Sequence, residues 1–338
     1  MLINERIAKF RSQIMGIAAI GVLLVHSRKI VGWSPVIKKL FGYGGIGVYV
    51  FVFLSAVGLY NSLKSSGGGY SKPEFYKRRA IRLIVPYCMI AGTWYGLVDL
   101  LIERNLALFL YDISTWSFWL EHKGAWYVAM LIPVYIFFPW FYDWAEKKNR
   151  DSRVLGSLVL VIILGFVCDA IRPRVYEHLS QVISSVIVYL IGFYYAGLDD
   201  KSNKSGILLG SICCAAYVVK AVTPLKNIEF VSNLSWAMLG IPIVFISAWC
   251  INAVQSRYLD CVLGFFGKYS LEMYLCNIFI IQAMTIFYGI NFFKSIGDER
   301  GYVTYAIVVI LGCLLSVIYG KISALLSNTL MLGVRSHK

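Results

Sequence analysis

The stretch RSQIMGIAAIGVLLVHSRKIVGW, residues Arg11 to Trp33, decides the fold class of this chain. Within it, Ile14 to Val25 form an unbroken run of apolar and small residues. With the flanks from Ser12 to Ser27, the run approaches the ~20 residues that a helix needs to cross a bilayer core. We therefore predict that this stretch is a first transmembrane helix.

One ionisable side chain, His26, lies inside this predicted span. A group that can become charged is costly in hydrocarbon unless it pairs or faces a wet cavity, so an intramembrane histidine is a functional candidate. Imidazole titrates near neutral pH, which suits it to take a proton from a sugar hydroxyl. The alternative is a histidine that packs between helices and bonds a carbonyl or serine, and the chemistry favours function over this alternative.

The composition indicates a polytopic helical membrane protein. Of the 338 residues, 59% are hydrophobic and only 15% are charged, whereas about a quarter of residues are charged in soluble proteins. The net charge of +14 does not indicate nucleic-acid binding, because the basic residues are scattered between apolar runs. No cleavable signal peptide is expected, since the first apolar run is too long and no small-residue cleavage pattern follows it.

The eight cysteines all lie within or beside apolar runs and lack metal-type spacing. We expect them to be small buried hydrophobic residues, and we predict no metal site. No internal repeat and no second, soluble domain is evident. We therefore expect one membrane domain over residues 1–338, with a helical core at about 12–326.

Ten apolar runs are long enough to be transmembrane spans. An aromatic-rich loop is expected at 103–123, between the third and fourth spans. If the N-terminus is inside, 20 of the 32 Lys and Arg residues lie on the same side, so the positive-inside rule places both termini in the cytoplasm. The expected spans are 12–27, 43–63, 83–102, 125–144, 154–171, 181–198, 206–222, 233–253, 270–293 and 302–326.

A cluster of basic residues precedes the third span. On a helix, Arg78 and Arg82 stand one turn apart and Arg79 is three residues from Arg82, so the guanidinium groups converge on one side. Guanidinium binds phosphate oxygens in bidentate pairs, so this cluster, with Lys77, suits a polyphosphorylated ligand. Membrane anchoring and orientation explain the cluster equally well.

Other polar and aromatic side chains are candidates for substrate contacts. Tryptophans at the interface either belong to an aromatic belt or stack on a sugar face. A polar group in an apolar run, such as Asn277, is expected to bond across helices. Two acids lie inside predicted spans, Asp99 and Glu272, and we favour a structural role for Asp99. The candidates for substrate binding are Ser55, Glu121, His122, Trp126, Tyr127 and Asn277.

Three pieces of the sequence together resemble the acyltransferase-3 family of integral-membrane acyltransferases, which O-acylate cell-surface glycans. The order of these pieces and the ten-span layout make the resemblance specific, and it extends over about residues 10–325. The pieces are GIAAIGVLLVHS (16–27), with His26 where the family has its histidine; GYGGIGVYVFVFLSAVGLY (42–60) with FYKRRAIRLIVPY (75–87); and GAWYVAMLIPVYIFFP (124–139) with GKYSLEMYLCNIF (267–279).

The resemblance implies a membrane O-acyltransferase of the bacterial cytoplasmic membrane. It would move an acyl group, with acetyl expected, from cytosolic acetyl-CoA or another acyl-CoA to a sugar hydroxyl of a cell-surface or lipid-linked polysaccharide. His26 is then the general base, although a transient acyl-histidine is a second route. No metal and no nucleic acid takes part. The implied CoA-binding residues are Lys77, Arg78, Arg79, Arg82 and Arg11.

Two positions depart from the family pattern. Family members commonly carry an arginine eleven residues before the histidine of the first span, and this position is Met15 here. Arg11 lies one turn earlier on roughly the same face, and we hypothesise that its long side chain substitutes for the missing arginine. The family motif in the ninth expected span often ends in histidine. This chain has Asn277 at that position, and its amide cannot exchange protons near neutral pH.

A different class of function is also compatible with polar groups inside spans. In a transporter or flippase for a lipid-linked glycan, His26, Asp99 and Glu272 would be coupling or gating groups. Transporters often show inverted repeats and matching broken helices, and the sequence shows neither. A scaffold subunit without activity is a third possibility, in which these polar groups only pack.

Overall fold

The computed structural model describes residues 2–67, 69–198, 203–284, 286 and 297–332, and within these ranges every regular element is a helix. Eight helical segments of this part of the chain are long and apolar enough to cross a membrane. A ninth span results if α1 (Ile3–Lys9) and α2 (Arg11–Ser27), which meet at 72°, count as one. The expectation of an all-α, polytopic membrane fold is therefore confirmed.

Each of the ten expected spans coincides with helical structure. The expected ninth span corresponds to the shorter apolar helix α15 (Ser270–Ala283), and most of its predicted remainder, at 285 and 287–293, lies outside the described residues. The other helices at predicted spans are α4 (Gly47–Lys64), α5 (Lys72–Tyr95), α8 (Trp126–Glu146), α9 (Arg150–Ile171), α10 (Pro173–Ala196), α11 (Lys204–Val222), α12 (Glu229–Met238), α13 (Gly240–Val254) and α17 (Tyr302–Leu332).

Helix α5 begins well before the expected start at residue 83. The side chain of Ser71 accepts a hydrogen bond from the backbone N–H of Glu74 at 3.4 Å and caps the helix. Lysine and arginine are good helix formers, so the basic segment continues the apolar span without a break. Pro86 lies inside α5, which is followed by a π-helical stretch at Gly96–Ile102.

The expected aromatic loop at 103–123 is largely helical, which corrects the prediction. It contains α6 (Leu106–Ile113) and α7 (Trp116–Glu121), and the Asn105 side chain caps α6 by accepting from the N–H of Leu108 at 3.0 Å. Two further short helices were not expected, α3 (Pro35–Gly42) and α14 (Arg257–Lys268). All four are shorter than a membrane span, so a search for long apolar runs does not find them.

The chain forms two compact units that are interleaved along the sequence. Unit 1 comprises Met1–Gly21, Gly45–Tyr70 and Phe138–Lys268, and unit 2 comprises Val22–Gly44, Ser71–Phe137 and Tyr269–Lys338. The single membrane domain over 1–338 stays a prediction.

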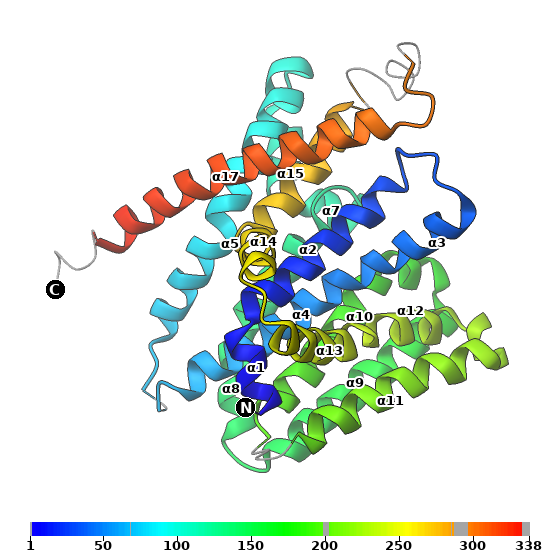
Figure 1. Ribbon diagram of the computed structural model, residues 1–338. Coiled ribbons are helices and arrows are strands. Elements are labelled where there is room, and N and C mark those ends of the chain that lie inside the picture. The colour runs from blue at the N-terminus through cyan, green and yellow to red at the C-terminus, as the bar shows by residue number, and fades with distance from the viewer. Residues whose placement is uncertain (1, 68, 199–202, 285, 287–296, 333–338) are drawn as a thin grey trace. The chain divides into compact units, whose positions relative to one another are not determined.

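In unit 1, α10 packs against α4 and α9, and α13 packs against α4 and α11 (Figure 1). The core between α4, α10 and α13 is aromatic. The ring centroids of Phe53 and Tyr195 are 5.8 Å apart, those of Phe53 and Phe245 are 5.9 Å apart, and those of Tyr195 and Phe245 are 5.3 Å apart. Aromatic pairs at these spacings add to the stability that burial provides.

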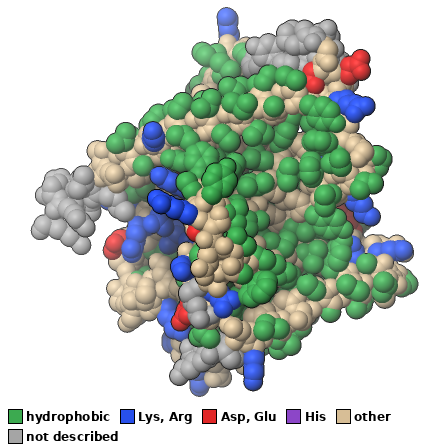
Figure 2. Space-filling view, in the orientation of Figure 1, with side chains coloured by type: hydrophobic (Ala, Val, Ile, Leu, Met, Phe, Trp, Pro, Cys, Tyr) green, Lys and Arg blue, Asp and Glu red, His purple; other side chains and the backbone are tan. Residues whose placement is uncertain are grey.

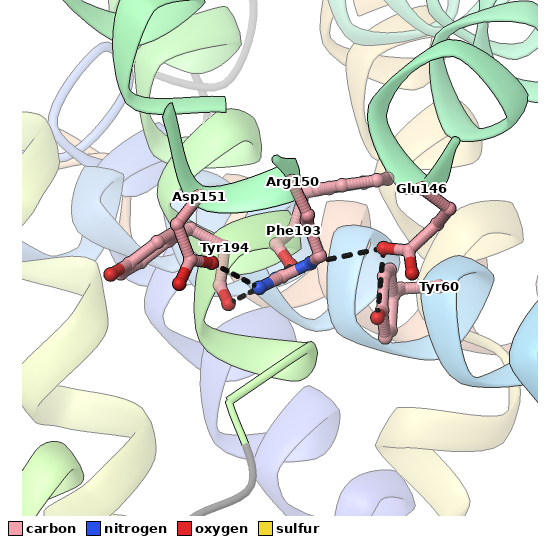
Figure 3. Close-up of polar contacts among 6 residues, drawn as sticks. All are labelled: Tyr60, Glu146, Arg150, Asp151, Phe193 and Tyr194. Atoms are coloured by element: carbon pink, nitrogen blue, oxygen red, sulfur yellow. Dashed lines mark hydrogen bonds and ion pairs between the residues drawn. The ribbon is translucent and has the colours of Figure 1, made fainter. Parts of the chain in front are cut away.

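Arg150 ties together several helix ends of unit 1 (Figure 3). Its guanidinium donates to the main-chain carbonyls of Phe193 and Tyr194 at 3.2 and 2.6 Å, at the end of α10. It also pairs with Glu146 at 3.0 Å, and Glu146 accepts the Tyr60 hydroxyl at 3.0 Å. The last carbonyls of a helix lack partners within it and attract cations, so Arg150 satisfies α10 while joining α4, α8 and α9.

In unit 2, α5, α15 and α17 pack against one another (Figure 1). Large apolar side chains are exposed in both units: Leu164 on α9 and Leu314 on α17 are each 57% exposed. Figure 2 shows broad areas of hydrophobic side chains on the visible face. Exposed apolar areas of this extent mark contact with a membrane or a partner. All eight cysteines are free, and Cys213 and Cys276 are buried as expected. The prediction of burial is wrong for four exposed cysteines, Cys88, Cys214, Cys250 and Cys261, because an apolar run can present some of its residues on the outer surface of the protein.

Candidate functional site

The predicted catalytic residue contacts one of the predicted substrate-binding residues. His26 lies in the last turn of α2 and Asn277 lies within α15, and both belong to unit 2. The imidazole Nδ1 of His26 is 2.6 Å from Oδ1 of Asn277. Asn277 is only 1% exposed, and His26 is half-buried. The intramembrane imidazole therefore has the cross-helix polar partner that such a group requires.

The surroundings of Asn277 indicate which imidazole nitrogen carries the proton. The Tyr305 hydroxyl donates its hydrogen to the carbonyl of Leu23, so only its lone pairs face other groups. Its oxygen lies beside the side chain of Asn277, whose Nδ2 is buried. The amide oxygen then faces His26 and accepts from Nδ1–H, which leaves the lone pair on Nε2.

One tyrosine outside the predicted site residues, Tyr274, contacts the predicted residue Tyr127 in unit 2. The backbone N–H of Tyr127 donates to the Tyr274 hydroxyl at 3.4 Å, and the two rings are 5.8 Å apart. The ring of Trp126 lies 6.1 Å from that of Tyr127. Tyr274 is one turn before Asn277 on α15. Helix α15 therefore carries both Asn277, the partner of His26, and Tyr274, which bonds the start of α8.

A second tyrosine constrains the turn before α8. Gly124 has a φ of +83°, and a Cβ at this position would lie 2.6 Å from the Tyr95 hydroxyl. Only glycine fits such a position without strain. Tyr95 and Tyr274 each have a polar tip inside an apolar span. This pattern is the sequence signal that could have identified them.

Glu121 and His122 are exposed at the end of α7. Glu121 pairs with Lys123 and accepts the Tyr111 hydroxyl at 3.2 Å. The Lys123 ammonium, with help from this hydroxyl, holds the pKa of Glu121 below its usual range. His122 has a left-handed backbone with a φ of +60°, and its ring lies 5.3 Å from that of Phe118. Glu121 is therefore a carboxylate at neutral pH.

The basic cluster lies on the first turns of α5, in unit 2. The Arg79 guanidinium lies 5.5 Å from the centroid of the Phe75 ring. Arg78 pairs with Glu74 at 3.4 Å, with side chains 42% and 61% exposed. Lys77 is half-buried, and Arg82 is exposed. All four residues lie on one helix, and the convergence of their cationic groups on one ligand stays a prediction.

Two predicted site residues, Arg11 and Ser55, belong to unit 1 and so do not share a unit with His26. Nη2 of Arg11 donates to the carbonyl of Leu54 at 3.3 Å, and the guanidinium lies against Gly58. Ser55 is half-buried on α4. The substitution of Arg11 for an arginine at Met15 stays a prediction.

The intramembrane acids do not gather into a metal site. Asp99 is 2% exposed, and its carboxyl group contacts that of Asp112. Glu272 is half-buried near Gly320 of α17. In the part of the chain that the structure describes, no group of three or more His, Cys, Asp or Glu side chains is positioned to hold a metal ion.

Comparison with known proteins identifies the family of the chain. A family model described as an acyltransferase domain (Acyl_transf_3) matches residues 14–321. A search of curated proteins and a search of solved structures gave no significant match. The matched range contains His26, Asn277 and the basic cluster of α5, and it covers most of the chain. The chain therefore belongs to the acyltransferase-3 family and is a membrane acyltransferase.

Proposed function

We propose that the protein transfers an acetyl group from cytosolic acetyl-CoA to a sugar hydroxyl of a cell-surface or lipid-linked polysaccharide. The observation that carries this proposal is the contact of His26 Nδ1 with Asn277 Oδ1 at 2.6 Å. The contact orients the ring and leaves Nε2 as the basic nitrogen, as a general base requires. Membership of an acyltransferase family supplies the reaction class.

The proposed transfer needs one base. Nε2 of His26 takes the proton from the sugar hydroxyl as its oxygen attacks the thioester carbonyl carbon. The tetrahedral intermediate then collapses, the C–S bond breaks, and the CoA thiolate leaves and takes up the proton that Nε2 holds. Asn277 acts as a positioning residue throughout, because its oxygen accepts the Nδ1 proton and stabilises the imidazolium as it forms.

The phosphates of CoA suit the basic cluster on α5. Lys77, Arg78, Arg79 and Arg82 bring four cationic side chains to its first turns, and guanidinium groups bind phosphate oxygens in bidentate fashion. In the proposed topology both termini are cytoplasmic and the protein resides in a bacterial cytoplasmic membrane. The basic cluster then faces the compartment that contains acyl-CoA.

Replacement of His26 tests the general-base proposal. Purified protein is incubated with labelled acetyl-CoA, and both CoA release and movement of label to saccharide are measured. We expect His26→Gln to lower the rate by about 10² to 10⁴ while the protein still folds and inserts. His178→Gln, which alters a histidine of α10 in unit 1, is the matched control and should be near normal. Near-normal transfer by His26→Gln would refute the proposal.

Replacement of Asn277 tests the positioning role. Asn277→Asp keeps an oxygen that accepts from Nδ1–H and should retain most activity. Asn277→Leu leaves Nδ1–H unpaired, so its kcat should fall by about tenfold or more while the KM for acetyl-CoA stays unchanged. Equal kcat values for the two variants would contradict this role. Label that remains bound to the protein after acid quenching would indicate the acyl-histidine route instead of direct transfer.

The acceptor is identified in cells. Mass spectrometry of surface polysaccharide with and without the gene reports the acyl group and the acceptor together. The strain without the gene is then complemented with either the wild-type or the His26→Gln gene. An acetyl substituent that returns only with the wild-type gene links the modification to the proposed site. Transport of a lipid-linked glycan without thioester cleavage would instead favour a flippase.

A further inference from the structure

The segment that follows His26 in unit 2, residues 28–42, is cationic. No acidic residue occurs between positions 6 and 73 of the chain, so no carboxylate of the same segment balances its charge. In the proposed topology the segment lies on the extracytoplasmic side, where the positive-inside rule disfavours cations. Membrane orientation therefore does not explain the four basic residues of this cationic segment, which are Arg28, Lys29, Lys38 and Lys39.

Lys29 places one of these charges beside the proposed base. Its backbone N–H donates to the carbonyl of His26 at 3.1 Å, in the turn that follows α2. Its side chain is exposed, and its ammonium is close enough to the imidazole to act on it electrostatically. A molecule that reaches the imidazole therefore meets a positive charge one turn further along the chain.

Arg28 places a second cation at the same helix end. Its guanidinium lies against Gly42, the last residue of α3, where a Cβ would be 2.9 Å from Nη1. Its Nε is buried and has no hydrogen-bond partner within the described residues. A buried donor without a partner is costly, and in a native protein such a donor calls for a bound water, ion or other acceptor. An anion at the guanidinium supplies acceptor oxygens there.

The turn before α17 packs against the cationic segment without neutralising it. The backbone N–H of Gly32 donates to the carbonyl of Arg300 at 2.8 Å. Asp298 is engaged within its own turn, because the N–H and the hydroxyl of Thr304 both donate to its Oδ2. Glu299 is exposed, as is Arg300. The two acids and one base of this turn leave the cationic segment with a net positive charge.

We propose that the acceptor sugar carries a negatively charged group near the hydroxyl that is acylated, and that Lys29 and Arg28 bind this group. The inference rests on the proposed acyl transfer and narrows its acceptor to an anionic glycan. Ammonium and guanidinium groups form strong, charge-assisted hydrogen bonds with carboxylate and phosphate oxygens. This chemistry has two sources, the carboxylate of an acidic sugar and a phosphate attached to the sugar.

The experiment has a binding arm and a transfer arm. Surface polysaccharide from a strain without the gene is separated on an anion exchanger into an acidic and a neutral fraction. Binding of each fraction to the full chain in neutral detergent is measured without acetyl-CoA, so this arm does not depend on turnover. Transfer of label from acetyl-CoA to each fraction is then measured. Chemical reduction of the carboxyl groups should abolish binding of the acidic fraction if they are the ligand, whereas phosphate survives this treatment.

The acidic fraction should bind and accept label, and the neutral fraction should do neither. Lys29→Gln and Arg28→Gln should each raise the dissociation constant and the KM for the acidic fraction by about 10- to 100-fold, because a charge-assisted hydrogen bond is lost. The kcat and the KM for acetyl-CoA should stay unchanged. Lys39→Gln, which removes the same charge from an exposed position on α3, is the control and should change binding by less than about threefold.

A second variant covers the case in which Arg28→Gln misfolds. Gly42→Ala displaces the guanidinium of Arg28 without removing its charge and should also weaken binding of the acidic fraction. Charge-selective binding by a wild-type protein that transfers no label would refute the proposed acyl transfer and leave the anionic-glycan site standing.

Four results would overturn the inference. The first is equal binding of the acidic and neutral fractions. The second is an equal effect of Lys29→Gln, Arg28→Gln and Lys39→Gln, which would show that only the general positive charge matters. The third is a lower kcat for every acceptor with an unchanged KM, which would assign the two cations to the oxyanion of the tetrahedral intermediate. The fourth is unchanged glycan binding in variants that lose stabilisation by phosphatidylglycerol nanodiscs, which would assign the cations to lipid headgroups.

Discussion

Arg150→Met should lower the free energy of unfolding of unit 1 more than the loss of an exposed ion pair would. The variant keeps an apolar stem of similar length but removes the guanidinium that joins α10 to α8 and α9 (Figure 3). Glu146 then loses its ion-pair partner, and the terminal carbonyls of α10 at Phe193 and Tyr194 lose their donor. The rings of Tyr60 and Tyr194 also lose a cation that lies 5.3 and 5.5 Å from their centroids.

The size of the effect follows from burial. The Arg150 side chain is 15% exposed, Glu146 is 33% exposed and Asp151 is 61% exposed. Breaking a fully buried pair costs about 3–5 kcal/mol, but Glu146 regains part of its hydration. The pair with Asp151 contributes at most about 1 kcal/mol. Loss of donors to buried carbonyls costs about 1–3 kcal/mol, so we expect a total of about 3 kcal/mol.

Equilibrium unfolding in mixed detergent micelles measures this difference. Arg78→Met is the matched control, since its pair with Glu74 is 42% and 61% exposed and should contribute less than about 1 kcal/mol. A double variant of Arg150→Met with Glu146→Gln should recover part of the loss, because no carboxylate is left unpaired. Equal free energies of unfolding for Arg150→Met and Arg78→Met would refute the argument from burial.

Two further predictions concern stability. A Cβ at Gly267 would lie 1.8 Å from the backbone oxygen of Ser12, whereas a Cβ at Gly264, one turn earlier on α14, would have nothing within 4 Å. Gly267→Ala should therefore lower the melting temperature, while Gly264→Ala should leave it unchanged or raise it through helix propensity; the reverse order would show that α14 does not pack closely on α2. The hydroxyl of Thr304, with backbone N–H groups, holds the pKa of Asp298 below its usual range. A carboxyl group with a lowered pKa in the folded state stabilises the fold at pH values above its unfolded-state pKa. This stabilisation is lost as the pH falls through the folded-state pKa. Asp298→Ala should thus melt below the wild type at neutral pH, with a gap that closes under about pH 4, and a gap that is constant with pH would contradict this.

The membrane helices could be predicted because each one depends on the composition of its own segment. A bilayer-spanning segment must satisfy its own backbone and present apolar side chains, so its composition alone identifies it. The expected span at 154–171 and the helix α9 that contains it illustrate this. The short helices α6, α7 and α14 escaped prediction because they are too short to span and their stability depends on the surfaces they cover.

The contacts of the candidate site needed the tertiary structure. His26 and Asn277 were each singled out as polar groups in apolar runs, but they are 251 positions apart in sequence, and nothing local joins them. Tyr274 and Tyr95 were not among the predicted site residues, although each has a polar tip inside an apolar run. Only the neighbours of their hydroxyl groups, Tyr127 and Gly124, reveal that they organise the start of α8.

The identity of residue 277 limits the proposed chemistry to one nitrogen. A histidine at this position, as the family often has, could accept the Nδ1 proton of His26 and pass it on. The Asn277 oxygen accepts a hydrogen bond but cannot take the proton near neutral pH. In the proposed reaction, the proton that Nε2 receives from the sugar must therefore leave through Nε2 as well, to the departing thiolate. The hydroxyl and the thioester sulfur then have to approach the same edge of the imidazole ring, which requires acceptor and donor to be bound together before the C–S bond breaks.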